Sequence, residues 1–312
     1  MKQYTSIKDI YNIEEAISEA IRLKEAPYMH SALGKHKTLV MLFFNSSLRT
    51  RLSTEKAAKQ LGMDVMVLNV SDAWKLEFED GTIMNLDTSE HVKEAAQVIS
   101  QYADIIAVRA FPTLADKEKD ESEIVLNSFI NYASVPIVNM ESATAHPLQA
   151  LADAITIEEF KSVSKPKVVL SWAPHPKALP QAVANSFAEM MRHLDVDFSI
   201  THPKGYELNP NIVKDVPIIY DQEEALKEAE FVYVKNWSSY KDYGKILNQD
   251  RAWMMTKAKL GEAKFMHCLP VRRNVVVEDA VLDSEQSIVI PQANNRTFAA
   301  QVVLKRILET IN

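Results

Sequence analysis

The sequence predicts an α/β protein with two domains, each a doubly wound parallel sheet covered by helices on both faces. Two observations predict this fold class. Short apolar runs without a helical period alternate with amphipathic segments along most of the chain, which is the pattern of strands joined by crossover helices. The 312 residues are enough for two domains, and a break at residues 162–165 separates two alternating series. We therefore place the domain boundary near residues 150–160.

The first alternating series is expected to form the N-terminal domain. It contains a polar stretch at residues 71–89. This stretch is long for a connection inside a compact α/β domain, which indicates a functional loop. The expected elements are, in chain order, a helix over 13–32, a strand over 38–44, a helix ending near Gly62, a strand over 64–70, the polar loop 71–89, a helix over 91–102, a strand over 105–109, a helix over 121–132 and a strand over 135–140.

The second series is expected to form the C-terminal domain. Its elements begin with a longer helix and close with another. They are, in order, a helix over 148–160, a strand over 167–172, a helix over 178–194, a strand over 196–201, a helix over 222–229, strands over 231–235, 265–269 and 287–290, and a helix over 297–311.

The composition excludes several classes of function. Hydrophobic residues make up 47% of the chain and charged residues 25%, as in ordinary globular proteins. The net charge of −7 argues against a nucleic-acid partner, and the one cysteine excludes internal disulfides and a cysteine-rich metal site. No run approaches the length of a membrane span and no apolar signal region opens the chain, so we expect a cytoplasmic protein with no membrane partner.

Polar residues follow several expected strands directly. In doubly wound sheets, ligands bind beyond the carboxyl ends of the strands. We therefore expect polar residues of both halves to converge on one cleft between the domains, namely Arg49, Arg109, Glu141, His146, His175, Lys235, His267 and Cys268.

The strongest single signal is the strand-to-helix turn at residues 45–51, Asn-Ser-Ser-Leu-Arg-Thr-Arg. Free N–H groups at a helix N-terminus and the helix dipole attract an anion, Ser47 and Thr50 add donors, and Arg49 adds a planar fork that suits phosphate oxygens. The turn lacks the glycines and lysine of a nucleotide P-loop. The alternative is a basic first turn that is merely solvated. Positive charge at a helix N-terminus is unfavourable because it opposes the dipole, so two arginines there favour a bound anion. The turn therefore predicts an anion site.

Three further segments carry candidate chemistry. His146 precedes Pro147 at the start of a helix, where the dipole lowers the pKa of an imidazole and favours a neutral hydrogen-bond donor. Arg109 ends a buried strand and needs an anionic or carbonyl partner, which could also be an internal salt bridge. His267 and Cys268 are adjacent on an expected strand and would point to opposite faces, so we do not expect a thiol nucleophile.

These segments together resemble the aspartate/ornithine carbamoyltransferase family. The family's motifs are matched in order by Ser47-Leu48-Arg49-Thr50-Arg51, His146-Pro147-Leu148-Gln149, His267-Cys268-Leu269-Pro270 and the arginine of Ala293-Asn294-Asn295-Arg296, which we expect before the last helix. The resemblance implies a carbamoyl-phosphate domain at residues 1–150 with a returning C-terminal helix at 295–312. It also implies an amino-acid domain at 151–294 and a homotrimer with sites shared between subunits.

The resemblance implies roles for individual residues. Carbamoyl phosphate would be held by Ser47, Leu48, Arg49, Thr50, Trp74, Arg109, His146, Gln149, Leu269 and Arg296. Thr50, Arg109, His146 and Arg296 would stabilise the oxyanion, with Arg49 and Cys268 also placed in the catalytic set. The acceptor would be held by Glu90, Glu141, His175, Lys235, Cys268, Arg272 and Arg273. No metal and no organic cofactor is expected.

The acceptor is indicated by a departure from the ornithine enzyme. That enzyme grips a free α-ammonium with an aspartate, whereas the matching stretch here is Phe231-Val232-Tyr233-Val234-Lys235-Asn236-Trp237-Ser238-Ser239. A lysine repels an ammonium but suits an acylated, uncharged α-nitrogen beside a carboxylate. Lys-Asn-Trp-Ser-Ser and Ala73-Trp74 resemble the N-acetylornithine and N-succinylornithine branch, in which Trp74 would reach a neighbouring subunit's phosphate. Glu90 would repel a succinyl carboxylate and tolerate acetyl, although the chain as a whole looks closer to the succinyl branch.

The expected mechanism is attack of the neutral δ-amine of the acylornithine on the carbamoyl carbon, with phosphate leaving and taking the amine proton. Orientation and charge stabilisation would supply most of the rate. Two other readings stay open. One is a carbamoyltransferase for free ornithine or aspartate, and Lys75 in the polar loop resembles the loop lysine of the aspartate enzyme. The other is a non-catalytic binding protein. Loss of Arg49, Arg109 or His146 would favour it, but all three are present.

Overall fold

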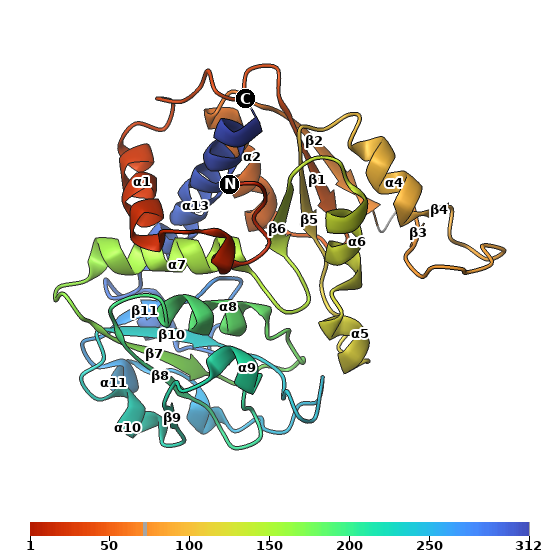
Figure 1. Cartoon of the computed structure of the whole chain (residues 1–312). Helices are drawn as coiled ribbons and strands as arrows, with labels where there is room; N and C mark the ends of the chain where they lie inside the picture. Colours follow the sequence, from red (N-terminus) through yellow and green to blue (C-terminus); the bar gives the residue numbers. More distant parts are fainter. Residues whose placement is uncertain (71–73, 312) are drawn as a thin grey trace. The chain divides into compact units, whose positions relative to one another are not determined.

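The computed structural model describes residues 1–70 and 74–311 and divides the chain into two compact units. Unit 1 comprises Met1–Thr113, Lys117–Leu148 and Arg296–Asn312, and unit 2 comprises Leu114–Asp116 and Gln149–Asn295. Figure 1 shows the elements of each unit coloured along the chain. Ala73 of the predicted Ala73-Trp74 pair and Asn312 of the predicted last helix lie outside the described residues.

Unit 1 is built on a four-stranded parallel sheet with the strand order β2-β1-β5-β6. Chain order and sheet order diverge between β1 and β5, so the carboxyl ends of these two strands form a topological switch point. The strands and helices of this unit are α1 (Ile13–Glu25), β1 (Thr38–Phe43), α2 (Leu48–Gln60), β2 (Asp64–Asn69), β3 (Leu76–Glu77), β4 (Glu90–His91), α4 (Val92–Ile99), β5 (Ile105–Arg109), α5 (Lys117–Glu121), α6 (Ile124–Tyr132), β6 (Ile137–Glu141) and the larger part of α13 (Val289–Ile311).

Both faces of the unit 1 sheet are buried because its strands are continuous apolar runs. Val40 and Leu42 share one core cluster with α4 and α6, which stand together beside the sheet in Figure 1. Leu39 and Met41 alternate with them and are fully buried on the opposite face. Helix α13 is tied to α1 by three ion pairs, from Lys305 and Arg306 to Glu19, each at 2.8 Å, and from Arg306 to Glu15 at 3.9 Å.

Unit 2 contains a five-stranded parallel sheet with the order β11-β10-β7-β8-β9. Its switch point lies between β7 and β10, and helix α8 packs on one face through Phe187 against Tyr233, with ring centroids 4.3 Å apart. The elements are the larger part of α7 (Pro147–Phe160), β7 (Lys167–Trp172), α8 (Ala182–Met191), β8 (Asp197–Thr201), α9 (Pro210–Val213), β9 (Ile218–Ile219), α10 (Gln222–Leu226), β10 (Phe231–Lys235), α11 (Lys257–Leu260), β11 (Lys264–Met266), α12 (Asp279–Leu282) and the first part of α13.

The predicted α/β class with parallel sheets is confirmed, but several element boundaries are wrong. Helix α1 ends at Glu25 because Pro27 follows and disfavours a helical conformation at Ala26. The helix expected over 121–132 is broken by Glu123, which has a φ of 51° and separates α5 from α6. The strand expected over 287–290 is wrong, since the apolar residues 288–290 lead into α13 instead. Such short apolar runs fit a strand or a buried helix equally well.

Candidate active site

The N-terminus of α2 lies at the switch point of unit 1, directly after β1. Ser47 caps the helix, and its Oγ accepts a hydrogen bond from the Thr50 N–H at 3.3 Å. No acidic residue occupies the first turn, so the N–H groups and the dipole face no negative side chain of their own helix. Arg49 is half-buried in this turn and Thr50 is buried. This geometry fits the predicted anion site at a helix N-terminus.

Arg109 is fixed beside this turn by three hydrogen bonds. Its Nη1 donates to the carbonyl oxygens of Asn45 and Ser46, both at 2.9 Å, and its Nη2 donates to Glu141 Oε2 at 3.0 Å. A register shift between β5 and β6 pairs Arg109 with Glu141, which brings the two charges together. Burial lowers the pKa of Arg109, Glu141 opposes that shift, and Arg49 adds to it. An arginine stays protonated at neutral pH, so the site keeps a buried cation.

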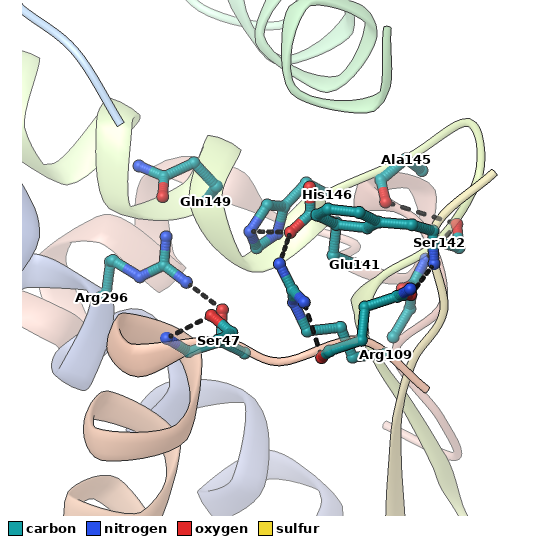
Figure 2. A network of polar contacts seen from close by, with 12 residues as sticks. Ser47, Arg109, Glu141, Ser142, Ala145, His146, Gln149 and Arg296 are labelled. Carbon is teal, nitrogen blue, oxygen red and sulfur yellow. Dashed lines mark hydrogen bonds and ion pairs between the residues drawn. The ribbon is translucent and has the colours of Figure 1, made fainter. Parts of the chain in front are cut away.

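Glu141 and His146 frame the other side of Arg109. Figure 2 shows the Arg109 and His146 side chains both directed at the Glu141 carboxylate, with His146 Nε2 3.4 Å from Oε2. His146 is buried and directly precedes α7, whose first residue is Pro147, as predicted. We predicted Glu141 as an acceptor ligand; the structure gives it an ion pair within unit 1.

The loop that carries His146 is held by Glu123, which the sequence analysis missed. Glu123 accepts hydrogen bonds from Ser142 Oγ at 2.8 Å and from the N–H groups of Ala143 and Thr144 at 3.1 and 2.7 Å. Its left-handed backbone and position between two short helices give no recognisable motif. Asn45, also unassigned from sequence, accepts a hydrogen bond from the Phe111 N–H at 2.6 Å.

Arg296 reaches the same turn from α13. Its Nη2 donates to Thr50 Oγ1 at 2.7 Å, and its side chain is buried. The expectation that Arg296 precedes the last helix is wrong, because α13 begins at Val289 and Arg296 lies in its interior. The helix thereby delivers a rigidly placed guanidinium to the cap of α2.

A second group of predicted residues lies at the switch point of unit 2. Lys235 ends β10, His175 follows β7, and His175 Nε2 accepts a hydrogen bond from Arg272 Nε at 3.1 Å. Burial lowers the pKa of His175, and the neighbouring charges of Arg272 and Lys235 lower it further, so the imidazole is neutral at neutral pH. Lys235 is buried, and its ammonium has no hydrogen-bond or ion-pair partner among residues 1–70 and 74–311. A cation in that setting is suited to an anionic ligand.

Arg272 and Arg273 have different surroundings. Arg273 forms ion pairs with Asp279 at 2.9 Å and with Asp283 at 2.7 Å, which raise the pKa of its guanidinium. Arg272 forms no ion pair with the described residues and instead touches His175. The structure therefore places only one member of this predicted pair beside the His175 group.

The predicted motif His267-Cys268-Leu269-Pro270 lies in a loop rather than on a strand. Strand β11 ends at Met266, so the expected strand over 265–269 is wrong and strand alternation does not orient His267 and Cys268. His267 Nδ1 accepts a hydrogen bond from the Leu269 N–H at 2.8 Å, and Leu269 has a φ of 55°. Cys268 is buried and forms no disulfide. The His267 side chain thus fixes the conformation of this turn. A fixed backbone fits the expected role of the turn in positioning a ligand.

The remaining predicted residues lie in the loop of unit 1 and on α7. Glu90 opens β4, which pairs with β3, and Trp74 is half-buried and packs on the unit 1 core. Lys75 forms an ion pair with Asp87 in the same loop. Gln149 belongs to unit 2, where its Nε2 donates to Asp153 Oδ1 at 2.7 Å. Asp153 is a third residue that the sequence analysis missed.

Unit 1 thus brings together Ser47, Arg49, Thr50, Arg109, Glu141, His146 and Arg296, and unit 2 brings together His175, Lys235 and Arg272. That the two sets line one cleft stays a prediction. In the described part of the chain, no three His, Cys, Asp or Glu side chains are arranged to hold a metal ion. None of the described helices is both long and apolar enough to cross a bilayer.

Comparison with known families gives a consistent result for both units. Residues 2–159 match the profile of the aspartate/ornithine carbamoyltransferase carbamoyl-P binding domain, and residues 180–307 match that of the Asp/Orn binding domain. The N-succinylornithine carbamoyltransferase of Bacteroides thetaiotaomicron is 52% identical over 315 residues, covering 99% of both chains. The N-acetylornithine carbamoyltransferase of Xanthomonas axonopodis pv. citri is 36% identical over 330 residues, covering 96% of both chains.

Solved structures give the same picture. An acetylornithine transcarbamylase complexed with acetylcitrulline matches with a TM-score of 0.92 and 34% identity, covering 98% of this chain and 99% of that chain. A variant of N-acetyl-L-ornithine transcarbamylase in which alanine replaces one glutamate, complexed with carbamyl phosphate and N-succinyl-L-norvaline, also matches with a TM-score of 0.92, at 34% identity over 98% of this chain and 100% of that chain.

Proposed function

Because this chain belongs to the aspartate/ornithine carbamoyltransferase family, we propose that it moves the carbamoyl group of carbamoyl phosphate to the δ-amine of an N2-acyl-L-ornithine, as a step in arginine biosynthesis. The products are an N-acylcitrulline and phosphate. The observation that carries the proposal is the cation set of unit 1, in which Arg109 and Arg296 are both fixed by hydrogen bonds at the N-terminus of α2. In this proposal residues 1–150 and 295–312 serve carbamoyl phosphate and residues 151–294 serve the acceptor.

The phosphate group is bound at the N-terminus of α2. Ser47, the Leu48 N–H, Arg49 and Thr50 supply donors, and the helix dipole favours the negative charge. Arg49 is free to turn its planar guanidinium towards phosphate oxygens, because no ion pair with the described residues holds it. Trp74 of a neighbouring subunit completes this pocket in the proposed trimer.

The carbamoyl oxygen is polarised by groups that are already in place before the reaction. Thr50, Arg109, His146 and Arg296 surround it, with Gln149 and Leu269 as further contacts. Preorganised donors of this kind stabilise the developing oxyanion without reorganisation in the transition state. The Asn45 and Ser46 carbonyls and Glu141 hold Arg109, so its remaining donors keep one direction.

The chemical step is an addition followed by an elimination. The lone pair of the neutral δ-amine forms a bond to the carbamoyl carbon, and the carbonyl π electrons move to oxygen. The tetrahedral adduct then expels phosphate as the C–O bond breaks, and the phosphate takes the amine proton. No side chain of the site is assigned as a dedicated base, so orientation and electrostatic stabilisation supply the rate.

The acceptor is held by the unit 2 group. Lys235 binds a carboxylate of the acylornithine and disfavours a free α-ammonium, which argues against ornithine itself. Neutral His175 lies beside the acceptor with both ring nitrogens already hydrogen-bonded, Nε2 by Arg272 and Nδ1 at the Lys177 backbone, and the backbone around Cys268 positions the amine. We assign Arg272, and not Arg273, to a substrate carboxylate, because Arg273 is already paired with two aspartates.

For the acyl group we propose N-acetyl-L-ornithine as the preferred acceptor within a succinyl-type lineage. Glu90 carries a negative charge in the loop that approaches the acyl group in this branch, and it would repel a succinyl carboxylate. In the solved acetylornithine enzyme, N-succinyl-L-norvaline was captured in variants that lack one glutamate. The 52% identity to a succinylornithine enzyme favours N-succinylornithine instead. Comparison of kcat/KM for the two substrates distinguishes these alternatives.

A homotrimer is part of the proposal and is supported by exposed apolar side chains on unit 1. Leu48 and Leu52 on α2 are 67% and 58% exposed, and Met66 and Leu68 on the edge strand β2 are also exposed. Such a set on an edge strand and the adjoining helix suits burial by another copy. A cytoplasmic location, expected from the sequence, also belongs to this proposal.

The test is a colorimetric ureido-product assay with carbamoyl phosphate and four acceptors: ornithine, aspartate, N-acetylornithine and N-succinylornithine. Product with either acylornithine supports the proposal. Product from free ornithine alone would establish the ornithine enzyme instead, and absence of product with all four would favour a binding protein.

A further inference from the structure

A fully buried carboxyl group in unit 2 is shared by two helices. Asp153 lies on α7, and its Oδ1 accepts hydrogen bonds from Gln149 Nε2 and from Gln292 Nε2, both at 2.7 Å. Gln149 is one turn earlier on the same helix, whereas Gln292 is on α13. One oxygen therefore fixes two side-chain amides that come from separate elements.

The second amide extends the network to the His267–Pro270 turn. Gln292 Oε1 accepts a hydrogen bond from the His267 backbone N–H at 2.9 Å, and His267 Nδ1 in turn accepts from the Leu269 N–H at 2.8 Å. All of Asp153, Gln292 and His267 are buried. The path from Asp153 to the turn consists of two hydrogen bonds through one glutamine.

A third residue approaches from the sheet. Tyr233 on β10 is fully buried, and burial, with Asp153 and Cys268 near its hydroxyl, raises the pKa of the phenol well above its usual value. Tyr233 therefore stays protonated and presents a hydroxyl to the same pocket of polar groups. Asp153 thus stands between the Gln149 side chain, the His267 turn and the middle of β10.

We propose that Asp153 is a positioning residue that sets Gln149 and the His267–Pro270 turn together, so that the carbamoyl contact and the amine-holding turn keep a fixed relation. The inference rests on the proposed function, because Gln149 and that turn matter only if the chain transfers a carbamoyl group. A purely structural role does not explain the residue well. Burying a carboxylate is costly, and an apolar side chain of similar volume is often as stabilising or more so.

Helices α7 and α13 are joined by a second hydrogen-bonded link, one turn after Asp153 and Gln292. Asn295 on α13 donates from Nδ2 to Thr156 Oγ1 at 3.0 Å and to Glu159 Oε2 at 2.7 Å. This second link joins α7 to α13 through Thr156 and Glu159 rather than through Asp153. It provides a matched control for Asp153.

The experiment measures kcat and both KM values for five single variants and one double variant. Asp153→Ala removes the shared acceptor and Asp153→Asn keeps an acceptor oxygen of the same shape. Thr156→Val removes one of the two hydrogen bonds of the control link at nearly constant volume. We expect Asp153→Ala to lower kcat by about tenfold or more, Asp153→Asn to recover most of that loss, and Thr156→Val to stay within about twofold of the wild type. Thermal melting of each variant reports folding independently.

A double-mutant cycle keeps Asp153 intact and remains informative if Asp153→Ala does not fold. Gln149→Ala and Gln292→Met are made singly and together; each removes one partner of Asp153, and no hydrogen bond joins the two glutamines in the described chain. If Asp153 couples them, their effects on kcat/KM are non-additive by about threefold or more. Additive effects would overturn the inference, as would equal losses from Asp153→Ala and Thr156→Val. Loss of transfer in the wild type itself would instead refute the proposed function.

Discussion

Arg296 donates a 2.7 Å hydrogen bond to the hydroxyl of Thr50, joining two residues 246 positions apart in the chain. Thr50 lies in the first turn of α2 and Arg296 in the interior of α13, so the contact fixes the proposed carbonyl-polarising arginine on the helix that binds the phosphate. Both side chains are buried, which strengthens the interaction and makes it costly to lose.

Thr50→Val should therefore reduce activity and stability together. Valine keeps the volume but removes the acceptor for Arg296, and we expect kcat/KM for carbamoyl phosphate to fall by about 10- to 100-fold. The free energy of unfolding should fall by about 1–3 kcal/mol, the cost of a lost buried hydrogen bond to a charged group. Thr54→Val, one turn further along α2 and equally buried, is the control for activity. Equal kinetic losses in the two variants would contradict the assigned role of Thr50.

Arg49→Ala should abolish most turnover without disturbing the fold. Arg49 is half-buried and unpaired among the described residues, so its removal leaves no buried partner behind. We expect kcat/KM for carbamoyl phosphate to fall by about a hundredfold or more, as for loss of one charged donor to the transition state. Arg51→Ala removes an exposed arginine from the same turn and should leave kinetics nearly unchanged. Turnover like that of the wild type in Arg49→Ala would refute the phosphate site.

The sequence predicted the sheet strands well because they are buried on both faces. The strands β5, β7 and β10 have the bounds expected from their apolar runs, and β1 differs by one residue. The turns that follow them could be placed for the same reason, which is why Ser47, Arg109 and His146 were found as a group. In parallel sheets the carboxyl ends of neighbouring strands meet at one edge, so strand placement alone indicates the site.

The residues that hold the site could not be found in this way. Glu123 acts through a left-handed backbone conformation, and Asp153 acts through Gln292, which is 139 positions away on a helix whose start resembled a strand. Contacts of this kind depend on tertiary packing, which local periodicity does not encode.

Arg272 and Arg273 are adjacent, but we expect their substitution to affect different properties, namely substrate binding for Arg272 and stability for Arg273. Arg272→Ala should raise KM for the acylornithine by about tenfold while leaving KM for carbamoyl phosphate near that of the wild type, because Arg272 belongs to the His175 group. Arg273→Ala should leave both KM values unchanged and lower the melting temperature at neutral pH.

The pH dependence of the Arg273 effect gives an internal check. Asn274 and Arg273 lower the pKa of Asp279, and Arg273 lowers the pKa of Asp283. The stabilisation by Arg273 is therefore present above the unfolded pKa of an aspartate and is lost as the pH falls through the folded pKa. The two melting curves should therefore converge in acid. A raised acceptor KM in Arg273→Ala would reverse the assignment of the pair.

His202 should make the protein less stable on mild acidification. It is fully buried against Tyr220 and Trp237, and burial lowers its pKa below the ordinary value of about 6.5. Below that value the unfolded chain binds a proton that the folded chain refuses, so the free energy of unfolding decreases as the pH falls, by at most about 1.4 kcal/mol per pH unit. The loss ends once the pH passes below the folded pKa.

His202→Asn removes this titration. Urea unfolding between pH 8 and pH 5 should show a shallower decline in the variant than in the wild type. Above pH 7, His202 is neutral in both the folded and the unfolded state. The free energy of unfolding should therefore change with pH equally in the variant and in the wild type there. Parallel curves across the whole range would exclude His202 as the responsible group.

Glu90 decides the acyl group in the proposed reaction. The wild type should show a higher kcat/KM for N-acetylornithine than for N-succinylornithine, because the Glu90 carboxylate repels the distal succinyl charge. Glu90→Ala should raise kcat/KM for the succinyl substrate by about tenfold or more and change the acetyl value much less. Glu94→Ala removes an exposed carboxylate of the neighbouring helix α4 and controls for the change in net charge. A clear succinyl preference in the wild type, with Glu90 present, would show that charge repulsion at this position does not set the acceptor.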